Sequence, residues 1–561
     1  MTKKKHLATN TQRRSKPTHE ADRRRRLAVA VFALSGMAAL IYEVAWTREL
    51  SLVFGSTVYA VSMMLTAFMS GLSLGAFLGG KWADESADLF ALFGRLETGI
   101  AVFGILTIPL TRALPDIYLA VYGALKPTFG LFFVIQLLLS FLIMLAPTTL
   151  MGATFPVVSK INTVTIKEVG TEVGNVYSVN TLGSIAGSLA AGFLLIPLVG
   201  VKATVFIAAG INLVVAVAMM TVASRPTLRK WLVGGAAALV FAAGLGLAAT
   251  ENVFAAGFYR IGEFSSLDAY RAYRDSMTVL YAEDDVHGRV AVLQDTAGHL
   301  HLQNSGKIEG STQPLDRQTT ALLADLPIAS ADSPRNVLII GLGTGFTTLE
   351  SLSHPVESVE TVEISDAVVE ASHYFVGDAL DSDPRSTIVI DDARNHLLKN
   401  DTHYDVVSSE PSYPLSTHVS HLFTLEFYQL VRDHLTENGV FCQWVPRYLL
   451  LDEDTLMMMK TFTQVFPNTY VWGSNQGENE AVDLLLIGVN GDAELRPAAI
   501  QAQIASSSDV ALDFGFFGGP NDIAQAVTDP SIPLNTDDRP LLEFRTPKNQ
   551  IEFFRQGRRS L

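Results

Sequence analysis

The chain has 561 residues, of which 48% are hydrophobic and only 17% are charged, and its formal net charge is −15. This length exceeds that of one ordinary domain, and so apolar a composition is unusual for a soluble protein. The single cysteine, Cys442, excludes a disulfide within the chain and any metal site built from several cysteines.

The first 26 residues are strongly basic. They hold ten Lys or Arg and two acids, a net charge of +8, and the remainder therefore carries −23, which together give the total of −15. We expect residues 1–26 to be a disordered tail on the cytoplasmic side of a membrane, because positive charge is retained there. No aromatic interleaving or folded basic module supports nucleic-acid binding. The apolar run from Leu27 is too long for a cleavable signal peptide.

Seven apolar stretches are long enough, at ~20 residues each, to span a membrane as helices. They cover 27–47, 57–80, 89–113, 129–151, 175–199, 201–223 and 230–249. Glycines four residues apart, Gly71 with Gly75 and Gly183 with Gly187, are typical of helices that pack closely in lipid. We therefore expect a transmembrane bundle of seven or eight helices over 27–250.

Two acids lie within these stretches, Glu43 and Glu97. An acid at membrane depth is a candidate functional residue. We expect instead that Glu43 pairs with Arg48 or Arg95 inside the bundle, or that its side chain extends to the membrane interface.

The pattern changes after residue 276. Short alternating strands at 278–281, 289–293 and 299–302 predict a small antiparallel sheet within 276–330. Over 331–490, apolar runs alternate with helical segments, which predicts a mostly parallel sheet with helices on both faces, a Rossmann-like α/β domain. Residues 491–561 remain as a C-terminal extension.

The clearest motif is a strand that runs into a glycine-rich turn containing Gly341, Gly343 and Gly345. The next strand ends in Glu363, and the third ends in Asp391 and Asp392. Glycines at such a turn let the backbone approach a ligand, and an acid at the next strand tip can accept both hydroxyls of a ribose. The turn differs from the phosphate-binding GxGxxG pattern, so it better suits S-adenosylmethionine or its decarboxylated form.

The fourth strand leads into Glu410, in a loop fixed by Pro411 and Pro414. A carboxylate there could accept a proton from an attacking amine or orient it. An alkyl amine, with a pKa of roughly 10, is mostly protonated near neutrality and needs such help. The alternative is that Glu410 only caps the loop. No zinc-ligand spacing or Ser-His-Asp arrangement is evident, and we expect no metal site.

With these motifs in place, the chain resembles the spermidine synthase (polyamine aminopropyltransferase) family, in its membrane-fused transporter/spermidine synthase branch. The resemblance rests on segments 337–345, 362–365, 391–394, 409–412, 422–428, 441–444 and 535–538. It implies a class I methyltransferase-type fold. It also implies that Glu363 holds the ribose hydroxyls, Asp392 holds the adenine amino group, and Glu410 stands where the family has its catalytic aspartate. Asn304, Lys307, Asp316 and Gln318 would help to close the small sheet over the donor.

Three departures from the family pattern bear on the reaction. Thr344 replaces the acid that holds the donor's terminal amine, Tyr413 replaces the second acid of the catalytic loop, and Glu410 is one methylene longer than aspartate. Without an acid at 344, the carboxylate of intact S-adenosylmethionine meets no repulsion there. Methyl or aminocarboxypropyl transfer from S-adenosylmethionine therefore stays open beside aminopropyl transfer.

The resemblance favours a membrane-bound transferase that moves an aminopropyl group from decarboxylated S-adenosylmethionine to a small amine or polyamine, with Glu410 and Tyr413 as the catalytic residues. The alternative from another class is a transporter or sensor that binds an adenosyl ligand or polyamine without turnover. A homodimer is a further expectation.

Adenosyl sulfonium donors are cytosolic, so we expect a multi-pass protein of the inner (plasma) membrane with a cytoplasmic catalytic domain. An odd count of spans would place that domain opposite a cytoplasmic tail. We therefore expect either a re-entrant segment or an eighth span in 114–128 or 250–264.

Overall fold

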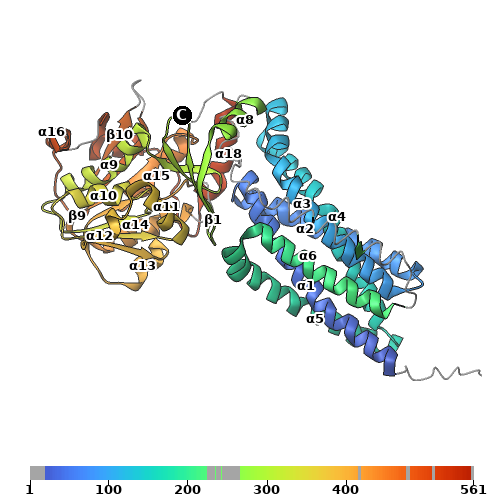
Figure 1. Cartoon of the computed structure of the whole chain (residues 1–561). Coiled ribbons are helices and arrows are strands. Elements are labelled where there is room, and N and C mark those ends of the chain that lie inside the picture. Colours follow the sequence, from blue (N-terminus) through green and yellow to red (C-terminus); the bar gives the residue numbers. More distant parts are fainter. Residues whose placement is uncertain are drawn as a thin grey trace, which may run out of the picture.

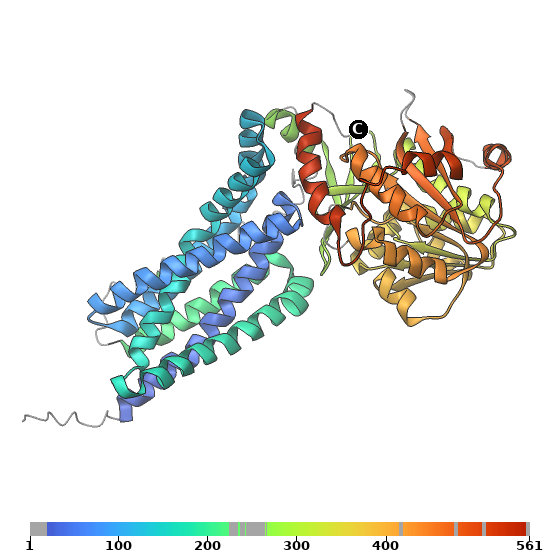
Figure 2. The ribbon, with the colours of Figure 1, turned by 180° about the vertical axis from the view of Figure 1, so that it is seen from behind.

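The computed structural model describes residues 19–223, 234–235, 242, 264, 266–414, 419–475, 481–507 and 512–556. The chain forms two parts, a bundle of long helices and an α/β part that meets one end of the bundle (Figure 1). The same division is visible from behind (Figure 2).

The bundle contains α1 (His19–Phe54), α2 (Val58–Glu85), α3 (Leu89–Leu125), α4 (Phe129–Asn162), η1 (Ile166–Glu168), α5 (Val169–Ala190), the π-helix η2 (Ala191–Leu195) and α6 (Ile196–Val222). Five continuous helical stretches in the described residues are long and apolar enough to cross a membrane. The fifth, Val169–Val222, breaks at Gly200, where φ is 76°. It folds back there, so that α5 and α6 both run along α1 (Figure 1).

Six of the seven predicted spans lie in these helices. The seventh, 230–249, lies outside the described residues except for 234, 235 and 242. Of the two places for an eighth span, 114–128 is the last part of α3 and the turn that follows, because α3 continues to Leu125. The other, 250–264, lies outside the described residues except for 264.

The predicted close packing at the paired glycines is confirmed. A Cβ atom at Gly71 would lie 1.8 Å from Thr148 Oγ1 on α4, and one at Gly183 would lie 1.9 Å from the Ala33 carbonyl oxygen on α1. Helix backbones can approach this closely only where a side chain is absent, and van der Waals contact then stabilises the pair in lipid.

Substituting Gly183→Leu should separate α5 from α1 and lower the melting temperature of the purified protein. Forcing extra methylenes into a packed interface typically costs about 1–3 kcal/mol. The matched control is Gly174→Leu on the same helix, where a Cβ would meet nothing within 4 Å. Equal melting temperatures for the two variants would contradict the close packing of α1 and α5.

The two arginines expected to pair with Glu43 have other hydrogen-bond partners. Arg48 donates to the carbonyl oxygens of Asp285 and Val286 in the α/β part, the second at 3.1 Å, rather than to Glu43. Arg95 donates to the Ala91 carbonyl oxygen, 3.2 Å away. Arg48 thus ties the bundle to the α/β part instead of neutralising an acid within it.

Glu97 is fully buried and joins three helices. It accepts hydrogen bonds from Ser35 Oγ on α1 at 2.5 Å and from Asn212 Nδ2 on α6 at 2.7 Å. A buried carboxyl group needs such donors, because an unsatisfied one is costly in an apolar environment. The pair of hydrogen bonds fixes α3 against its two neighbours.

The start of α1 and the α/β part lie at opposite ends of the bundle (Figures 1 and 2). At the end of α1, Glu49 forms an ion pair with Arg289 of the α/β part, with 3.1 Å between Oε1 and Nη2. If the bundle spans a membrane, the basic start of α1 (His19–Arg26) and the α/β part face different sides. With this part of the basic segment in the cytoplasm, the α/β part would not be cytoplasmic, so the two predictions exclude each other.

The small antiparallel sheet follows helix α8 (Leu267–Ser276). Its strands are β1 (Thr278–Asp284), β2 (Arg289–Gln294), β3 (Leu300–Asn304) and β4 (Lys307–Ser311), in that spatial order. The first three strands were predicted and β4 was not. β4 is short and polar, and Gly310 interrupts it, so it carries little strand signal.

The main sheet has eight strands in the order β12-β10-β11-β9-β8-β5-β6-β7. Its strands are β5 (Asn336–Ile340), β6 (Ser358–Glu363), β7 (Ser386–Ile390), β8 (Tyr404–Ser409), β9 (Leu435–Pro446), β10 (Thr469–Asn475), β11 (Ala481–Val489) and β12 (Phe514–Gly518). The five strands from β9 to β7 are parallel, whereas β11 pairs antiparallel with β9 and β10. The α/β fold expected from the alternating pattern is confirmed, as a mixed sheet.

The described helices of the α/β part are α9 (Pro314–Ser330), α10 (Phe346–Ser353), α11 (Asp366–Val376), α12 (Ala379–Ser382), α13 (Ala393–Lys399), η3 (Ser420–Phe423), α14 (Leu425–Asp433), α15 (Asp452–Thr463), α16 (Pro497–Ser507), α17 (Pro520–Ala526) and α18 (Leu541–Arg555). Strand β12 belongs to the main sheet, so this sheet extends past residue 490. Parallel strands place their carboxyl ends on one edge, where ligands of such sheets bind.

Candidate active site

A cavity of about 1240 Å³ opens at the carboxyl ends of the parallel strands. The small sheet and the ends of α1 and α2 also line it. Nine carboxylates line the cavity, against Arg48 and Lys307 as its Lys and Arg residues: Asp285, Asp295, Glu309, Asp316, Glu363, Asp391, Asp392, Glu410 and Asp483. Such an excess of one charge attracts cationic ligands and repels anionic ones.

The glycine turn after β5 brings two strand tips together. Gly341 has a φ of 93°, and a Cβ there would lie 2.7 Å from the Glu410 carbonyl oxygen. The position therefore requires glycine both for its backbone conformation and for space. The turn lines the cavity through Gly341, Gly343 and Thr344.

Glu363, at the end of β6, lies against this turn. Its carboxylate accepts hydrogen bonds from the backbone N–H groups of Leu342 at 2.9 Å and Ser365 at 3.1 Å. Burial raises the pKa of Glu363, although these backbone hydrogen bonds oppose the shift. Glu363 also lines the cavity, so its carboxylate lies where a ligand bound at the glycine turn would meet it.

Asp391 and Asp392 follow β7 and both line the cavity. Asp391 pairs with Lys399 at 2.7 Å, and the hydrogen bond from Lys399 lowers its pKa. Asp392 caps α13 by accepting from the Asn395 N–H at 2.8 Å and lies 3.5 Å from His421 Nε2, which lowers its pKa. Both carboxylates are therefore held in their charged form.

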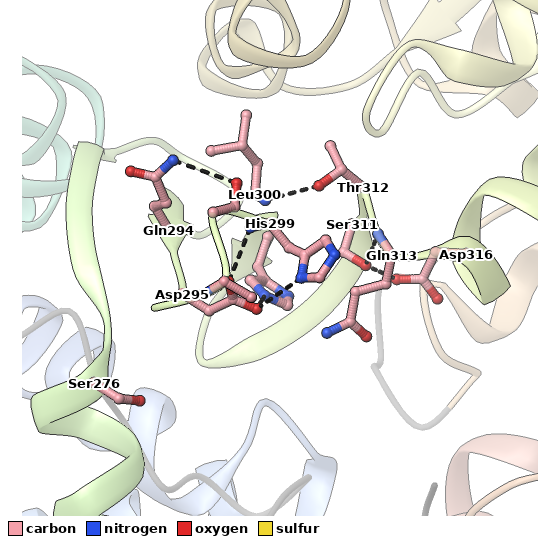
Figure 3. Close-up of polar contacts among 12 residues, drawn as sticks. Ser276, Gln294, Asp295, His299, Leu300, Ser311, Thr312, Gln313 and Asp316 are labelled. Atoms are coloured by element: carbon pink, nitrogen blue, oxygen red, sulfur yellow. Dashed lines mark hydrogen bonds and ion pairs between the residues drawn. The ribbon is translucent and has the colours of Figure 1, made fainter.

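Polar contacts join residues of the small sheet and the start of α9 (Figure 3), and Asp295, Ser311 and Asp316 among them line the cavity. Burial alone would raise the pKa of Asp295, but hydrogen bonds from His301 and His299 lower it to about 2. Ser311 donates to Asp316 among the same contacts. The neighbouring Gly310 packs against Thr344, since a Cβ on Gly310 would lie 3.0 Å from its Cγ2. Asp316 thus adds a carboxylate to the cavity that Thr344 also lines.

Glu410 lies just past β8. Its backbone N–H donates to the Ile340 carbonyl oxygen at 3.1 Å, and Thr347 Oγ1 donates to its carboxylate at 3.3 Å. Burial first, and then the negative charge of Asp483, raises the pKa of Glu410 to about 8. The carboxyl group therefore holds a proton near neutrality and can exchange it near working pH, as a general acid or base requires.

Asp483 is a site residue that the sequence analysis missed. It lies on β11 and accepts hydrogen bonds from Thr319 Oγ1 and Trp444 Nε1, both at 2.9 Å. Burial raises its pKa to about 6, although the hydrogen bond from Thr319 opposes the shift. The available signal was an acid within the apolar run of residues 481–489, where a buried strand would exclude a charge that had no function or partner.

Of three further predicted site residues, one lines the cavity and two do not. Asn304 lines the cavity, with its Oδ1 accepting from Ser305 Oγ at 3.0 Å. The Gln318 amide is used by the loop at Asp513, donating to its carbonyl oxygen at 2.8 Å and accepting from its N–H at 2.6 Å. Tyr413 is fully buried, and its hydroxyl donates to the Tyr448 carbonyl oxygen. Gln318 and Tyr413 do not line the cavity, so roles for them in donor binding and catalysis stay predictions.

Within the described residues, a group that could hold a metal ion consists of His373, Asp378 and Asp381. These residues lie at the surface and do not line the cavity. His373 Nε2 and Asp381 form an ion pair at 2.8 Å, which accounts for their closeness without an ion.

Comparison with known families places this site in context. Residues 317–473 match the family model described as "Spermine/spermidine synthase domain". The polyamine aminopropyltransferase of Bacillus subtilis (strain 168) is 30% identical over 158 residues, which are 28% of this chain and 56% of that protein. Putrescine N-methyltransferase 3 of Nicotiana tabacum is 29% identical over 209 residues, which are 36% of this chain and 51% of that protein. The chain thus spans about half the length of these relatives.

Among solved structures, the chain is similar to spermidine synthase from Thermotoga maritima. It is 23% identical, covers 45% of this chain and 87% of its own, and gives a TM-score of 0.38. The family match begins in α9 and ends in β10, so it includes the glycine turn, Glu363, Asp391, Asp392 and Glu410. Residues 317–473 are therefore similar to the spermine/spermidine synthase domain, and a helical region precedes them in the chain.

Proposed function

We propose that this protein transfers an aminopropyl group from decarboxylated S-adenosylmethionine to an amine. The observation that carries the proposal is the cavity in which Glu363 of the nucleoside side and Glu410 of the catalytic loop lie among nine carboxylates. A sulfonium donor and an amine acceptor are both cations, and an acidic cavity stabilises both. The polyamine aminopropyltransferases among its relatives support the reaction type.

The reaction is a direct displacement. The amine nitrogen forms a bond to the carbon next to sulfur, and the carbon–sulfur bond breaks with its electron pair passing to sulfur, which leaves as a neutral thioether. The surplus proton of the amine passes to Glu410. The protein contributes alignment of the two reactants and acceptance of the proton. A bound sulfonium would favour the charged form of Glu410, since a nearby positive charge lowers the pKa of an acid.

The charge of the cavity favours the decarboxylated donor. Intact S-adenosylmethionine carries a carboxylate, and Asp316, Glu309 and Asp483 line the cavity in which it would bind. Two like charges 4 Å apart repel by about 4 kcal/mol at an effective dielectric constant of 20. The acid missing at Thr344 is thus offset by acids from the small sheet, from α9 and from β11.

Calorimetry on the purified protein tests this proposal. We expect the decarboxylated donor to bind at least about tenfold more tightly than S-adenosylmethionine, a modest part of the repulsion above. As a matched control, Asp316→Asn removes one of the charges that repel the intact donor. This variant should bind the two donors with more similar affinities than the wild type does. Tighter binding of intact S-adenosylmethionine would contradict aminopropyl transfer.

Methyl transfer from intact S-adenosylmethionine is the second candidate, and one observation favours it. The putrescine N-methyltransferase relative aligns over 209 residues, more than the 158 of the aminopropyltransferase relative. Thr344 also removes the acid that would repel the intact donor. For a methyltransferase, intact S-adenosylmethionine binds more tightly than the decarboxylated donor in the calorimetric experiment. The amine product then carries a new methyl group.

We propose a multi-pass location in the inner (plasma) membrane, which the five apolar stretches support. Two arguments place the catalytic domain on opposite sides of the membrane. The need for a cytosolic donor favours a cytoplasmic domain. The positive charges favour the reverse, because Arg23–Arg26, Lys81 and Lys160 lie at the end away from the domain. A homodimer stays a prediction.

A further inference from the structure

The cavity continues from the catalytic site into the helical bundle. It is lined there by residues of α1, α2, η2 and α6: Val44, Thr47, Ser51, Leu52, Val58, Val61, Ser62, Gly192 and Ile196. Its volume of about 1240 Å³ exceeds the ~300–1,000 Å³ typical of a pocket for one small molecule. A nucleoside donor and a short amine therefore leave the bundle part of the cavity unused.

This part of the cavity reaches well into the bundle. Val44 precedes the end of α1 at Phe54 by ten residues, or about 15 Å at the rise of a helix. The side chains that line it are aliphatic or carry a single hydroxyl, with Arg48 at the junction with the α/β part. Such a wall suits an apolar chain, because it offers contact area without a charge that would need a partner.

An irregular helix borders the same region. The π-helix η2 separates α5 from α6, and π-turns inside helices occur frequently at functional sites. Gly192, within η2, lines the cavity, and a Cβ there would meet nothing within 4 Å. Unlike Gly183, this glycine is not required by helix packing, so its absent side chain widens the cavity.

The charge at the other end of the cavity limits the head group. Nine carboxylates face Arg48 and Lys307, so a cationic head is favoured and an anionic phosphate beside the amine is repelled. We infer that the acceptor is a cationic amphiphile, an aliphatic chain that ends in an amine. The chain lies along α1, α2 and η2, and the amine reaches Glu410. This inference rests on the proposed transfer and names its acceptor class.

The chemical step is the one described above. The terminal amine nitrogen bonds to the carbon next to sulfur, the carbon–sulfur bond breaks toward sulfur, and Glu410 takes the proton. The product is an amphiphile with one more amine and the same apolar chain.

The test uses the full-length protein in lipid nanodiscs, with 1,4-diaminobutane, N-dodecyl-1,4-diaminobutane and phosphatidylethanolamine as probes. Both transfer and equilibrium binding are measured. The variant Gly192→Leu fills the bundle part of the cavity. Gly210→Leu on α6 is the matched control, because a Cβ there also meets nothing within 4 Å and Gly210 does not line the cavity. Both variants are measured in nanodiscs of the same lipid. Partition of a probe into the lipid therefore cannot account for a difference between them.

We expect Gly192→Leu to weaken binding of the dodecyl amine by about tenfold, as for the loss of two buried methylene groups. Binding of 1,4-diaminobutane should not change, and Gly210→Leu should match the wild type with both probes. Equal binding of the dodecyl amine by both variants would overturn the inference, as would preferred alkylation of phosphatidylethanolamine.

The two proposals fail in different ways. If 1,4-diaminobutane is alkylated and Gly192→Leu changes nothing, aminopropyl transfer stands and the amphiphile is overturned. If the dodecyl amine binds in a way that depends on Gly192 but no amine is alkylated, the amphiphile site stands and transfer is overturned.

Discussion

Glu410→Gln should lower kcat by about 10²–10⁴-fold, the usual contribution of a positioned general base, and leave donor binding unchanged. Glutamine has nearly the same shape but cannot accept the proton of the amine. In the wild type, the rate should rise as pH increases through about 8, because the carboxylate form of Glu410 is the base. The variant should lack the part of this rise that Glu410 contributes. The measurement is kcat from pH 6.5 to 9.5, with donor affinity from calorimetry.

Stability provides the control for this variant. The folded-state pKa of Glu410 is raised from 4.5 to about 8, so between these values the folded protein binds more protons than the unfolded chain. Its stability therefore falls as pH rises through this window. Glu410→Gln removes this loss of stability, because the amide does not titrate. The melting temperature of the variant at pH 8.5 should therefore be no lower than that of the wild type. An unchanged kcat in a folded variant would remove Glu410 from the mechanism.

Asp483→Asn should raise KM for the amine by about 10–100-fold, since a hydrogen bond to a charged group contributes roughly 1.5–3 kcal/mol. With a pKa of about 6, Asp483 is charged at pH 7.5 and faces the cavity. Asn keeps the size of the side chain and can still accept a hydrogen bond from Trp444 or Thr319. The measurement is the dependence of rate on amine concentration at pH 7.5.

The same substitution should also move the pH profile of kcat to lower pH. The charge of Asp483 raises the pKa of Glu410, and removing it makes Glu410 easier to deprotonate. A purely structural role would not produce this shift. Asp433→Asn, an exposed acid at the end of α14, is the control and should change neither KM nor the profile. If KM rises but the pH profile of kcat does not move, the charge of Asp483 does not act on Glu410.

The residues that could be predicted from the sequence are those that follow the parallel strands. The glycine turn, Glu363, Asp391, Asp392 and Glu410 each come directly after an apolar run, and parallel strands bring such tips to one edge. Asp483 escaped this reasoning because it lies inside β11, which pairs antiparallel with β9. Its distance from Glu410 depends on that pairing, which no local pattern specifies.

Two side chains whose partners lie far along the chain show the same limit. Gln318 was expected near the donor, but its amide is used by the loop at Asp513, which lies almost 200 residues further along the chain. Arg48 was expected to pair within the bundle, but it donates to carbonyl groups of the turn between β1 and β2. A side chain's partner across the chain follows from tertiary packing, and sequence spacing does not reveal it.

The opposite placement of the start of α1 and the α/β part has a consequence for biosynthesis. The α/β part leaves the ribosome only after the helices of the bundle. If the basic start of α1 stays in the cytoplasm, the α/β part crosses the membrane during synthesis and folds on its other side. There the single thiol, Cys442, is buried in β9 and has no second cysteine in the chain with which to form a wrong disulfide. A chain with one buried cysteine can fold in an oxidising compartment without help from a disulfide isomerase.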